Sequence, residues 1–403
     1  MLQKKSYQLG VGGATITPLH RKYVNQVLDS GRLTYGPFLK RFEAEFARLH
    51  KRRFAVSANS GTSALQVAVH ALRELGGWKD GDEVIIPALT FVATANVVIQ
   101  NNLKPVFVDI DPKTYHIDPK KIGAAITKRT RAIMPVHVFG VSAEMRPIQR
   151  IAKKHGLRVI EDSCEAMFVD HHGEPVGSQG EVACFSTYQA HIATTGVGGF
   201  ACTNDPVIAV KLRSLVNHGR DSIYYAMDHD QGKRGKALAE MISRRFSFVT
   251  VGYSYRLTEL EGALGVAELA QWEKNMDRRQ ANADLLLRRL KPFARYLQLP
   301  SWPPHSEHAF MMFPIVIKDA RITKPDITQH LEEWNVETRD MLPLLNQPIY
   351  HKLFGKDIES KFPIAKFVRE NGFYVGCHQG LKKQDIGYMA DVFGEYFKKK
   401  ELA

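Results

Sequence analysis

The sequence has few cysteines and no long apolar run. Its 403 residues include 4 cysteines, too few for a disulfide scaffold. None of them has CxxC spacing, so the sequence indicates neither a zinc ribbon nor a dithiol redox motif, and we expect no metal site. No apolar stretch approaches the roughly 18 residues that cross a bilayer, and the opening MLQKKSYQLGVGG lacks the apolar core of a secretion signal. We therefore expect a cytoplasmic protein with free thiols that does not enter a membrane.

Acidic residues are also in the minority. The chain has 55 Lys and Arg against 42 Asp and Glu, which gives a formal net charge of +13. This excess favours an anionic partner, such as nucleic acid, an acidic membrane surface or a phosphorylated small molecule. Apart from Lys398, Lys399 and Lys400, the basic residues are spread along the chain, as is typical of a solvated surface. Nucleic acid is therefore not the expected partner.

Short apolar runs alternate with helical patterns between residues 53 and 220. The runs are FAVS (54–57), EVIIP (83–87), KPVFVDI (104–110), RAIMPVH (131–137), LRVIED (157–162), VACFS (182–186) and GGFACT (198–203). Helical patterns follow several of them, for example TSALQVAVHALREL from Thr62. The alternation predicts an α/β domain with a mostly parallel sheet flanked by helices. Ligands of such sheets bind beyond the carboxyl ends of the strands.

The rest of the chain predicts three further units. Residues 221–250 are polar, charged and without clear period, which indicates an inserted flap. A long helix pattern runs from Thr258 to Leu290 and would bridge two domains. A smaller α+β domain is indicated by MMFPIVI (311–317), a helical run near 325–334, GFYVGC (372–377) and a final amphipathic helix. We therefore expect a large domain over 1–255 with the flap inside it, a bridging helix over 256–290 and a small C-terminal domain over 291–403.

Two strand ends carry groups suited to an anionic, ring-shaped ligand. SANSGTSAL (57–65) puts Gly61 and Thr62 at a strand-to-helix turn, where free N–H groups can bind a phosphate. VIEDSCEA (159–166) puts Asp162 just past a buried strand, where a carboxylate can hold a ring nitrogen in its protonated form. Taken singly, the first is also an ordinary capped helix and the second an ordinary loop carboxylate.

Two further segments add a hydroxyl group, a histidine and an aromatic ring. FSTYQAHIATTGVGGFACT (185–203) contains Ser186, which can bind a phosphate, and His191, which can titrate near neutrality. Phe91, in PALTFVATANVV, follows another strand and can stack on a planar ring. A lone histidine is more often structural, and packing in the core explains the phenylalanine about as well.

The ordered set of these segments resembles the DegT/StrS-type sugar aminotransferases, which are pyridoxal-phosphate enzymes of aspartate-aminotransferase fold. The resemblance covers nearly the whole chain, from SGRLTYGPFLKRFE (30–43) to the C-terminal domain. Its motifs include PVFVDIDPKTYHID, PVHVFG, EDSCEA, NHGRD (217–221) and GYSYRLTELEGALG (252–265). It implies a seven-stranded type of sheet, a homodimer with active sites shared between subunits, and a nucleotide sugar as substrate.

The resemblance assigns roles to the candidate residues. It places Gly61, Thr62 and Ser186 on the cofactor phosphate, Phe91 on the face of the ring, and Asp162 at the pyridine nitrogen.

Four positions depart from the usual family pattern, and His191 is one of them. Glu165 stands where the family usually has Gln or His, near the phenolic oxygen of the cofactor. Ser254 stands where many members have an Asn that reaches the phosphate from the neighbouring subunit, so the resemblance places a shorter side chain at that contact. Val197 stands in the glycine turn where most members have Glu.

His191 is the departure with the largest consequence. It occupies the position of the lysine that bonds covalently to the cofactor, and no lysine lies between Glu181 and Asp205. An imidazole cannot make that bond, but its pKa near 6.5 suits it to move a proton at the C4′ carbon of the cofactor. The same exchange occurs in the family's sugar 3-dehydratases. Their iron–sulfur branch needs a cysteine cluster, whereas this chain has no cysteine between Cys202 and Cys377, so the resemblance favours the iron-free branch.

The sequence thus favours a dehydratase of a nucleotide-linked 4-keto-6-deoxy sugar, using pyridoxal or pyridoxamine phosphate with glutamate as amino donor. Such an enzyme would belong to deoxysugar or surface-polysaccharide biosynthesis. Two alternatives stay open: an atypical sugar aminotransferase of the same family, and a binding or regulatory relative without catalysis.

Overall fold

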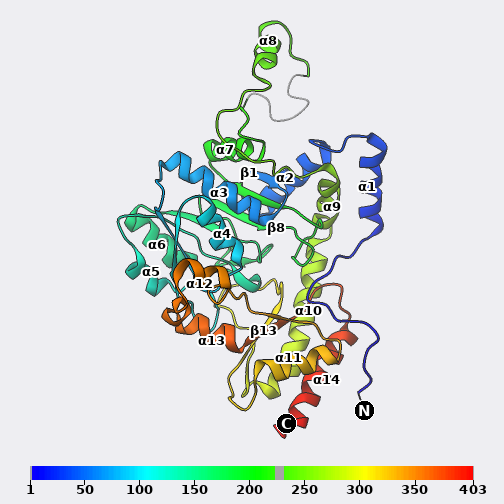
Figure 1. The fold of residues 1–403 in the computed structure, drawn as a ribbon. Helices are drawn as coiled ribbons and strands as arrows, with labels where there is room; N and C mark the ends of the chain where they lie inside the picture. The colour runs from blue at the N-terminus through cyan, green and yellow to red at the C-terminus, as the bar shows by residue number, and fades with distance from the viewer. Residues whose placement is uncertain (1, 223–230, 403) are drawn as a thin grey trace.

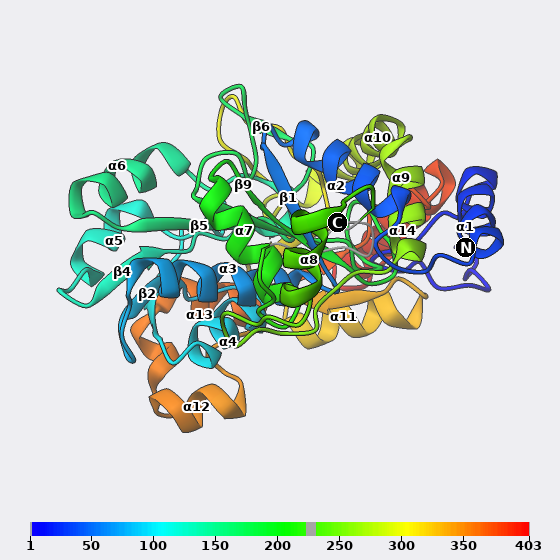
Figure 2. The same cartoon turned by 90° about the horizontal axis from the view of Figure 1, so that it is seen from above.

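A seven-stranded sheet forms the centre of the larger half of the molecule (Figures 1 and 2). The computed structural model describes residues 2–222 and 231–402. The strand order is β1-β9-β8-β5-β4-β2-β3. All adjacent pairs from β8 to β3 are parallel, whereas β9 runs antiparallel to both of its neighbours. The strands are β1 (Phe54–Ala58), β2 (Glu83–Pro87), β3 (Lys104–Val108), β4 (Thr130–Ile133), β5 (Arg158–Asp162), β8 (Val182–Ser186) and β9 (Gly199–Thr203). Each falls on one of the seven apolar runs, so the predicted mostly parallel sheet is confirmed.

Helices cover the faces of this sheet, and several of them follow its strands directly. They are α2 (Pro37–Leu49), α3 (Gly61–Gly76), α4 (Val92–Gln100), α5 (Pro119–Ala125), α6 (Met145–His155) and α7 (Pro206–Val216), with α1 (Pro18–Ser30) packed outside them on α9. The short pair β6 (Asp170–His171) and β7 (Glu174–Pro175) forms a separate two-stranded sheet. Because β5 and β8 carry buried side chains on both faces, they read in the sequence as unbroken apolar runs.

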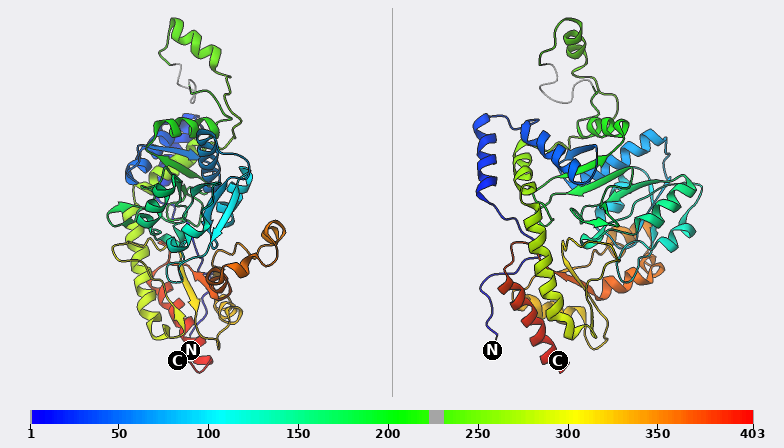
Figure 3. Two further views of the ribbon diagram at one scale, coloured as in Figure 1. Left: turned by 90° about the vertical axis from the view of Figure 1, so that its left-hand side faces the viewer. Right: turned by 180° about the vertical axis from the view of Figure 1, so that it is seen from behind.

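Two helices, rather than one, connect the halves of the molecule. The pattern from Thr258 predicts a single helix, but the structure has α9 (Glu259–Leu269) and α10 (Trp272–Leu290), interrupted where Gln271 leaves helical geometry. α9 packs against α1 and α2, whereas α10 packs against α14 (Lys383–Lys399). The start of α10 still packs on the core of the large half through Met276, whereas Leu286 and Leu290 near its end join the core of the C-terminal half. Figure 3 shows α10 running from the large sheet toward the C-terminal half.

The C-terminal half is built on a four-stranded antiparallel sheet of order β10-β11-β13-β12. Its elements are β10 (Leu297–Gln298), β11 (Phe313–Ile317), α11 (Lys324–Glu333), β12 (Thr338–Asp340), α12 (Pro348–Phe354), α13 (Pro363–Asn371), β13 (Gly372–Val375) and α14. The N-terminal segment joins this half, because Leu9 is fully buried in its core and forms a parallel bridge with Val336. The proposed domain boundaries at residues 255 and 290 stay a prediction.

The segment predicted as a flap contains one helix, α8 (Gly235–Arg244), although the sequence there has no clear period. Residues 223–230 of the segment lie outside the described residues. Arg244 donates to both carboxylate oxygens of Asp221, at 2.8 Å to Oδ1 and 2.9 Å to Oδ2, which ties the end of α8 to the base of the segment. In Figures 1 and 3, α8 lies well away from the two sheets. Within residues 2–222 and 231–402, no helix is both long and apolar enough to span a bilayer.

Candidate active site

Seven of the eight candidate residues line one cavity of about 380 Å³ at the carboxyl ends of the parallel strands. They are Gly61, Thr62, Phe91, Asp162, Glu165, Ser186 and His191. They lie at the ends of β1, β2, β5 and β8 of the large half or just after them, and the C-terminal half closes the cavity from the other side. The topology of the sheet therefore brings together groups that lie far apart in the sequence, such as Gly61 and His191.

One end of the cavity is suited to a phosphate. Ser60 caps α3 and accepts from the Ser63 N–H at 3.0 Å, which leaves the N–H groups of Gly61 and Thr62 at the helix N-terminus without an intrahelical acceptor. A Cβ on Gly61 would stand 2.6 Å from the Cβ of Ser186, so only glycine permits this close approach. Hydroxyl and amide donors thus meet at the positive end of α3, where an anion is stabilised.

Asp162 supplies a buried carboxylate in the middle of the cavity. It is 4% exposed, its Oδ2 accepts from the Thr94 hydroxyl at 2.8 Å, and its Oδ1 accepts from the Cys164 N–H at 3.2 Å. Burial raises the pKa of Asp162, and these hydrogen bonds only partly offset that rise. An uncompensated buried carboxylate favours a cationic partner, and a protonated ring nitrogen in the cavity meets that need.

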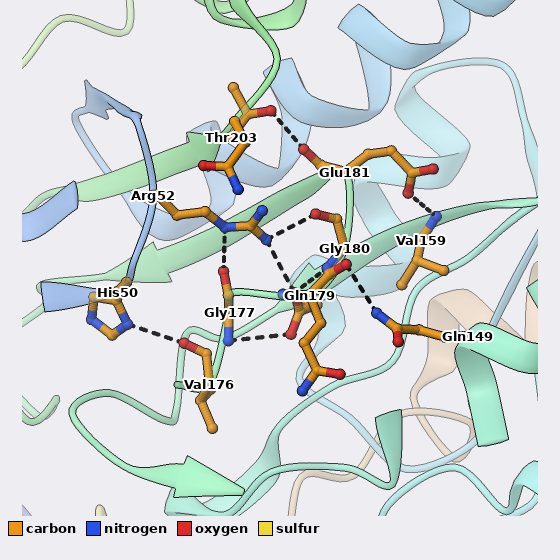
Figure 4. A network of polar contacts seen from close by, with 12 residues as sticks. His50, Arg52, Gln149, Val159, Val176, Gly177, Gln179, Gly180, Glu181 and Thr203 are labelled. Atoms are coloured by element: carbon orange, nitrogen blue, oxygen red, sulfur yellow. Dashed lines mark hydrogen bonds and ion pairs between the residues drawn. The ribbon is translucent and has the colours of Figure 1, made fainter. Parts of the chain in front are cut away.

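A polar network behind β5 fixes the backbone that carries Asp162. Glu161 is fully buried and accepts from Nε2 of His137 at 3.1 Å and from Arg52 at 3.3 Å. Arg52 also donates to the carbonyls of Gly177, at 2.7 Å, and Gly180, at 2.8 Å (Figure 4). Burial by itself would raise the pKa of Glu161, but the hydrogen bond from His137, the charge of Arg52 and the N–H of Gly180 outweigh it and leave that pKa lowered. The charge behind the strand is therefore compensated, unlike the charge in the cavity.

Glu165 holds a second carboxyl group at the cavity wall. Its Oε2 accepts from the N–H of Phe139 at 2.9 Å, and Phe139 has a left-handed backbone with φ of 61°. Burial raises the pKa of Glu165 to about 7, and the nearby negative charge of Asp162 adds to the rise, while the Phe139 hydrogen bond opposes it. The side chain can therefore hold a proton at neutral pH and donate it in a hydrogen bond to an oxygen in the cavity.

His191 lies on the cavity wall in the turn after β8. Its backbone N–H donates to the carbonyl of Tyr188 at 2.9 Å, and the two rings meet edge to face at 6.0 Å. The ring nitrogen Nδ1 is buried without a hydrogen-bond partner in the described part of the chain. Burial lowers the pKa of His191 to about 4, and the positive charge of Arg279 contributes to the decrease. The expectation that His191 titrates near neutrality is therefore wrong for this buried ring: the imidazole is neutral at physiological pH and can accept a proton.

The aromatic side chain of Phe91 completes the set from the large half. It is the residue before α4, and 58% of it is exposed although it lines the cavity. Phenylalanine in a hydrophobic core would be buried, so the packing alternative that the sequence left open does not describe this residue. An exposed ring at a cavity wall is placed to stack on a planar ligand.

Several cavity residues have no sequence signal that identifies them. The C-terminal half contributes Met311, Met312, Leu342 and Tyr374, and the N-terminal segment contributes Val11. These residues lie in apolar runs or loops, where the sequence pattern predicts burial but does not identify a ligand site. Tyr188 also lines the cavity, and its position in the FSTYQAH segment could have marked it.

Ser254 lies outside this cavity. It is exposed, pairs through the backbone with Asn217, and its Oγ accepts from Arg256 at 3.1 Å. The expected role of Ser254 at a partner subunit's site stays a prediction. Val197, which departs from the family pattern in the glycine turn, is 50% exposed and is not among the cavity residues.

Comparisons with known proteins agree with this fold and site. The model of the DegT/DnrJ/EryC1/StrS aminotransferase family matches residues 15–393. The GDP-perosamine synthase of Caulobacter vibrioides is 32% identical over 382 residues, covering 94% of this chain and 95% of that protein. The dTDP-4-dehydro-2,6-dideoxy-D-glucose 3-dehydratase of Saccharopolyspora spinosa is 33% identical over 380 residues, covering 91% and 82%.

One similar solved structure contains the cofactor. The GDP-4-keto-6-deoxy-D-mannose-3-dehydratase of E. coli, solved with bound hydrated PLP, superposes with a TM-score of 0.85 at 26% sequence identity. The match covers 97% of this chain and 99% of that one. The predicted fold, a large mainly parallel sheet flanked by helices with a smaller α+β half, is therefore confirmed.

Proposed function

Because the chain belongs to the DegT/DnrJ/EryC1/StrS aminotransferase family, and is thus a pyridoxal-phosphate-dependent sugar-modifying enzyme, we propose that it is a nucleotide-sugar 3-dehydratase. Its proposed substrate is a nucleotide-linked 4-keto-6-deoxy sugar. The observation that carries this proposal is that His191 lines the cavity and that, in the described part of the chain, no lysine lines it.

The cavity residues fit the cofactor. The amide groups of Gly61 and Thr62 and the hydroxyl of Ser186 would hold its phosphate, Phe91 would stack on its ring, and Asp162 would pair with its ring nitrogen. The uncompensated charge of Asp162 is the strongest sign of fit, since a protonated pyridine nitrogen would neutralise it.

Each group has a defined task in the proposed reaction. When bound, the cofactor supplies an electron sink. Asp162 keeps the ring nitrogen protonated, and Glu165 donates a hydrogen bond to the phenolic oxygen. His191, neutral and without a partner at Nδ1 in the described chain, accepts and returns the proton at the C4′ carbon. Because no lysine is available in the described cavity to bond to the cofactor, transfer of the amine to the sugar is disfavoured.

The balance of the reaction distinguishes it from amine transfer. In the proposed dehydration, two electrons pass from glutamate to the sugar: the sugar loses its C3 oxygen, and glutamate leaves as 2-oxoglutarate and ammonia. In amine transfer, glutamate also becomes 2-oxoglutarate, but the nitrogen stays on the sugar and no ammonia is released. The aminotransferase alternative therefore predicts a 4-amino sugar and no free ammonia.

The test is to incubate the protein with pyridoxal phosphate, glutamate and a panel of nucleotide-linked 4-keto-6-deoxy sugars, and to measure ammonia, 2-oxoglutarate and the product mass. Equal amounts of ammonia and 2-oxoglutarate with a 3-deoxy sugar would support the dehydratase. A 4-amino sugar would support an aminotransferase, and no turnover on any member of the panel would support a non-catalytic relative.

A substitution tests the role of the histidine. His191→Asn should keep cofactor binding and lose about 10²–10⁴-fold in rate, as expected for a positioned proton-transfer group. His155→Asn is the matched control, since His155 is exposed at the end of α6. Unchanged turnover of His191→Asn would remove the basis for the dehydratase proposal.

A further inference from the structure

Arg279 is a buried cation behind the candidate active site. It lies on α10 and is 0% exposed, and it is among the largest fully buried side chains of the described residues. Burying a guanidinium is costly unless it is paired with a carboxylate or hydrogen-bonded. All the hydrogen bonds that the structure describes for Arg279 go to main-chain carbonyls rather than to a carboxylate. In the described part of the chain no carboxylate is hydrogen-bonded to this guanidinium, and the groups that favour its charged form from a distance are Cys377 and Glu268.

The accepting carbonyls belong to the walls of the cavity and their immediate neighbours. Nη2 of Arg279 donates to the carbonyl of His191 at 3.1 Å. Nη1 donates to the carbonyls of Phe310, at 3.2 Å, and Met311, at 3.3 Å. His191 and Met311 both line the cavity, one from the large half and one from the C-terminal half. One side chain of α10 thus joins the histidine turn to the segment before β11.

The titratable groups around His191 come from both halves of the molecule. Arg279 approaches from α10, Asp162 and Glu165 line the same cavity from the end of β5 and the loop after it, and Tyr374 lines it from β13. Burial disfavours the protonated form of His191, and among these groups the positive charge of Arg279 disfavours it further. The same group therefore fixes the position of the histidine and favours its neutral form.

We propose that Arg279 is a positioning residue of the active site, which holds the His191 turn against the cavity and keeps the imidazole in its neutral, proton-accepting form. The catalytic part of this inference rests on the proposed function, because it takes His191 as the acid/base. Its electrostatic part concerns only the folded chain.

Two substitutions separate the hydrogen bonds from the charge. Arg279→Lys keeps the positive charge but loses the planar fork that reaches several carbonyls. Arg279→Gln removes the charge but keeps an amide donor. Arg278→Met is the matched control, because the adjacent Arg278 is exposed and donates to the carbonyl of Leu381 at 3.3 Å, away from the cavity.

The first measurement is the titration of His191 by NMR in the full-length protein without substrate, with its signal assigned by comparison with His191→Asn. Arg279→Gln should raise the proton affinity of His191 at least about tenfold, whereas Arg279→Lys and Arg278→Met should leave it near the wild-type value. An unchanged titration in Arg279→Gln would overturn the electrostatic role, even if the enzyme is a dehydratase.

The second measurement is turnover by the holoenzyme. Arg279→Lys should lower kcat by about 10²-fold with little change in KM, since the imidazole is displaced while the substrate contacts remain. Wild-type kcat in Arg279→Lys would overturn the positioning role. If the titration shifts as expected but no variant and no wild-type protein dehydrates any sugar, the proposed function fails while the effect of Arg279 on His191 stands.

Discussion

Replacing Asp162 by Asn should have opposite effects on cofactor binding and on the stability of the cofactor-free chain. The substitution keeps the shape of the side chain and removes its charge. The Thr94 hydroxyl lies 2.8 Å from Oδ2 of Asp162 and also 2.8 Å from the hydroxyl of Thr90. It can therefore turn, accept from the new amide and donate to Thr90, while the amide oxygen keeps the hydrogen bond from Cys164.

The expected loss of cofactor affinity follows from the burial of the site. Removing one member of a buried charge pair costs about 3–5 kcal/mol, because the other member is left uncompensated. At about 1.4 kcal/mol for each factor of ten, the Kd for pyridoxal phosphate should rise about 10²–10⁴-fold. In the cofactor-free chain the carboxylate has no cationic partner among the described residues, so Asp162→Asn should unfold at the same temperature as wild type or higher.

The pH dependence of folding stability is an independent test of whether Asp162→Asn stabilises the cofactor-free chain. Burial raises the pKa of Asp162 in the folded chain above its unfolded value of about 3.9. The stability contributed by this proton is fully present below the unfolded pKa and is lost as the pH rises through the folded pKa. The stability of Asp162→Asn relative to wild type should therefore increase as the pH rises above about 4, and then level off.

The assay is a fluorescence titration of the cofactor-free protein with pyridoxal phosphate, together with thermal unfolding of the same samples across pH. Glu161→Gln is the matched control, because Glu161 is the adjacent carboxylate and is paired with His137 and Arg52. That variant should lose about 3–5 kcal/mol of stability without cofactor. Wild-type affinity in Asp162→Asn would refute the assignment of this residue to the ring nitrogen. A large loss of stability in the same variant would refute the argument from burial.

Two further predictions concern the cofactor linkage and the assembly. Borohydride reduction of the holoenzyme followed by peptide mapping should find no pyridoxyl-lysine, because His191 cannot bond covalently to the cofactor and no lysine lines the described cavity. A modified lysine anywhere in the chain would show that the active site lies elsewhere. Sedimentation at micromolar concentration should give a homodimer, with Ser254 and Arg256 contributing to the partner's site, since both are exposed outside the candidate active site of their own chain. A fully active monomer would contradict shared sites.

The seven strands of the large sheet could be predicted because each of them is a local feature. A strand buried on both faces must be apolar throughout, so the runs at 83–87 and 182–186 mark β2 and β8 without knowledge of the rest of the chain. The same holds for the ends of these strands, where Gly61, Asp162 and His191 interrupt the apolar pattern. Parallel strands then bring those ends to one edge, so most of the cavity follows from the sequence.

Helix breaks and isolated helices are set by contacts that the sequence pattern does not contain. The periodicity from Thr258 continues through Gln271, where the helix is nonetheless interrupted; α9 packs on α1 and α2, whereas α10 packs on α14. α8 forms in a segment without clear period, where the Arg244 side chain closes an ion pair with Asp221. In both cases a partner distant in the sequence decides the local structure.

Only the tertiary structure decided the environment of each functional group. Glu161 and Asp162 are adjacent carboxylates, yet their pKa values move in opposite directions, because the first is paired with Arg52 and His137 behind β5 and the second faces the cavity. Likewise, helical spacing puts Arg279 on the same face as Met276 and Ala283, but only the structure shows that its side chain contacts the His191 turn. The sequence determines which chemical groups are available, whereas burial and the charge of distant neighbours determine which protonation state each group holds.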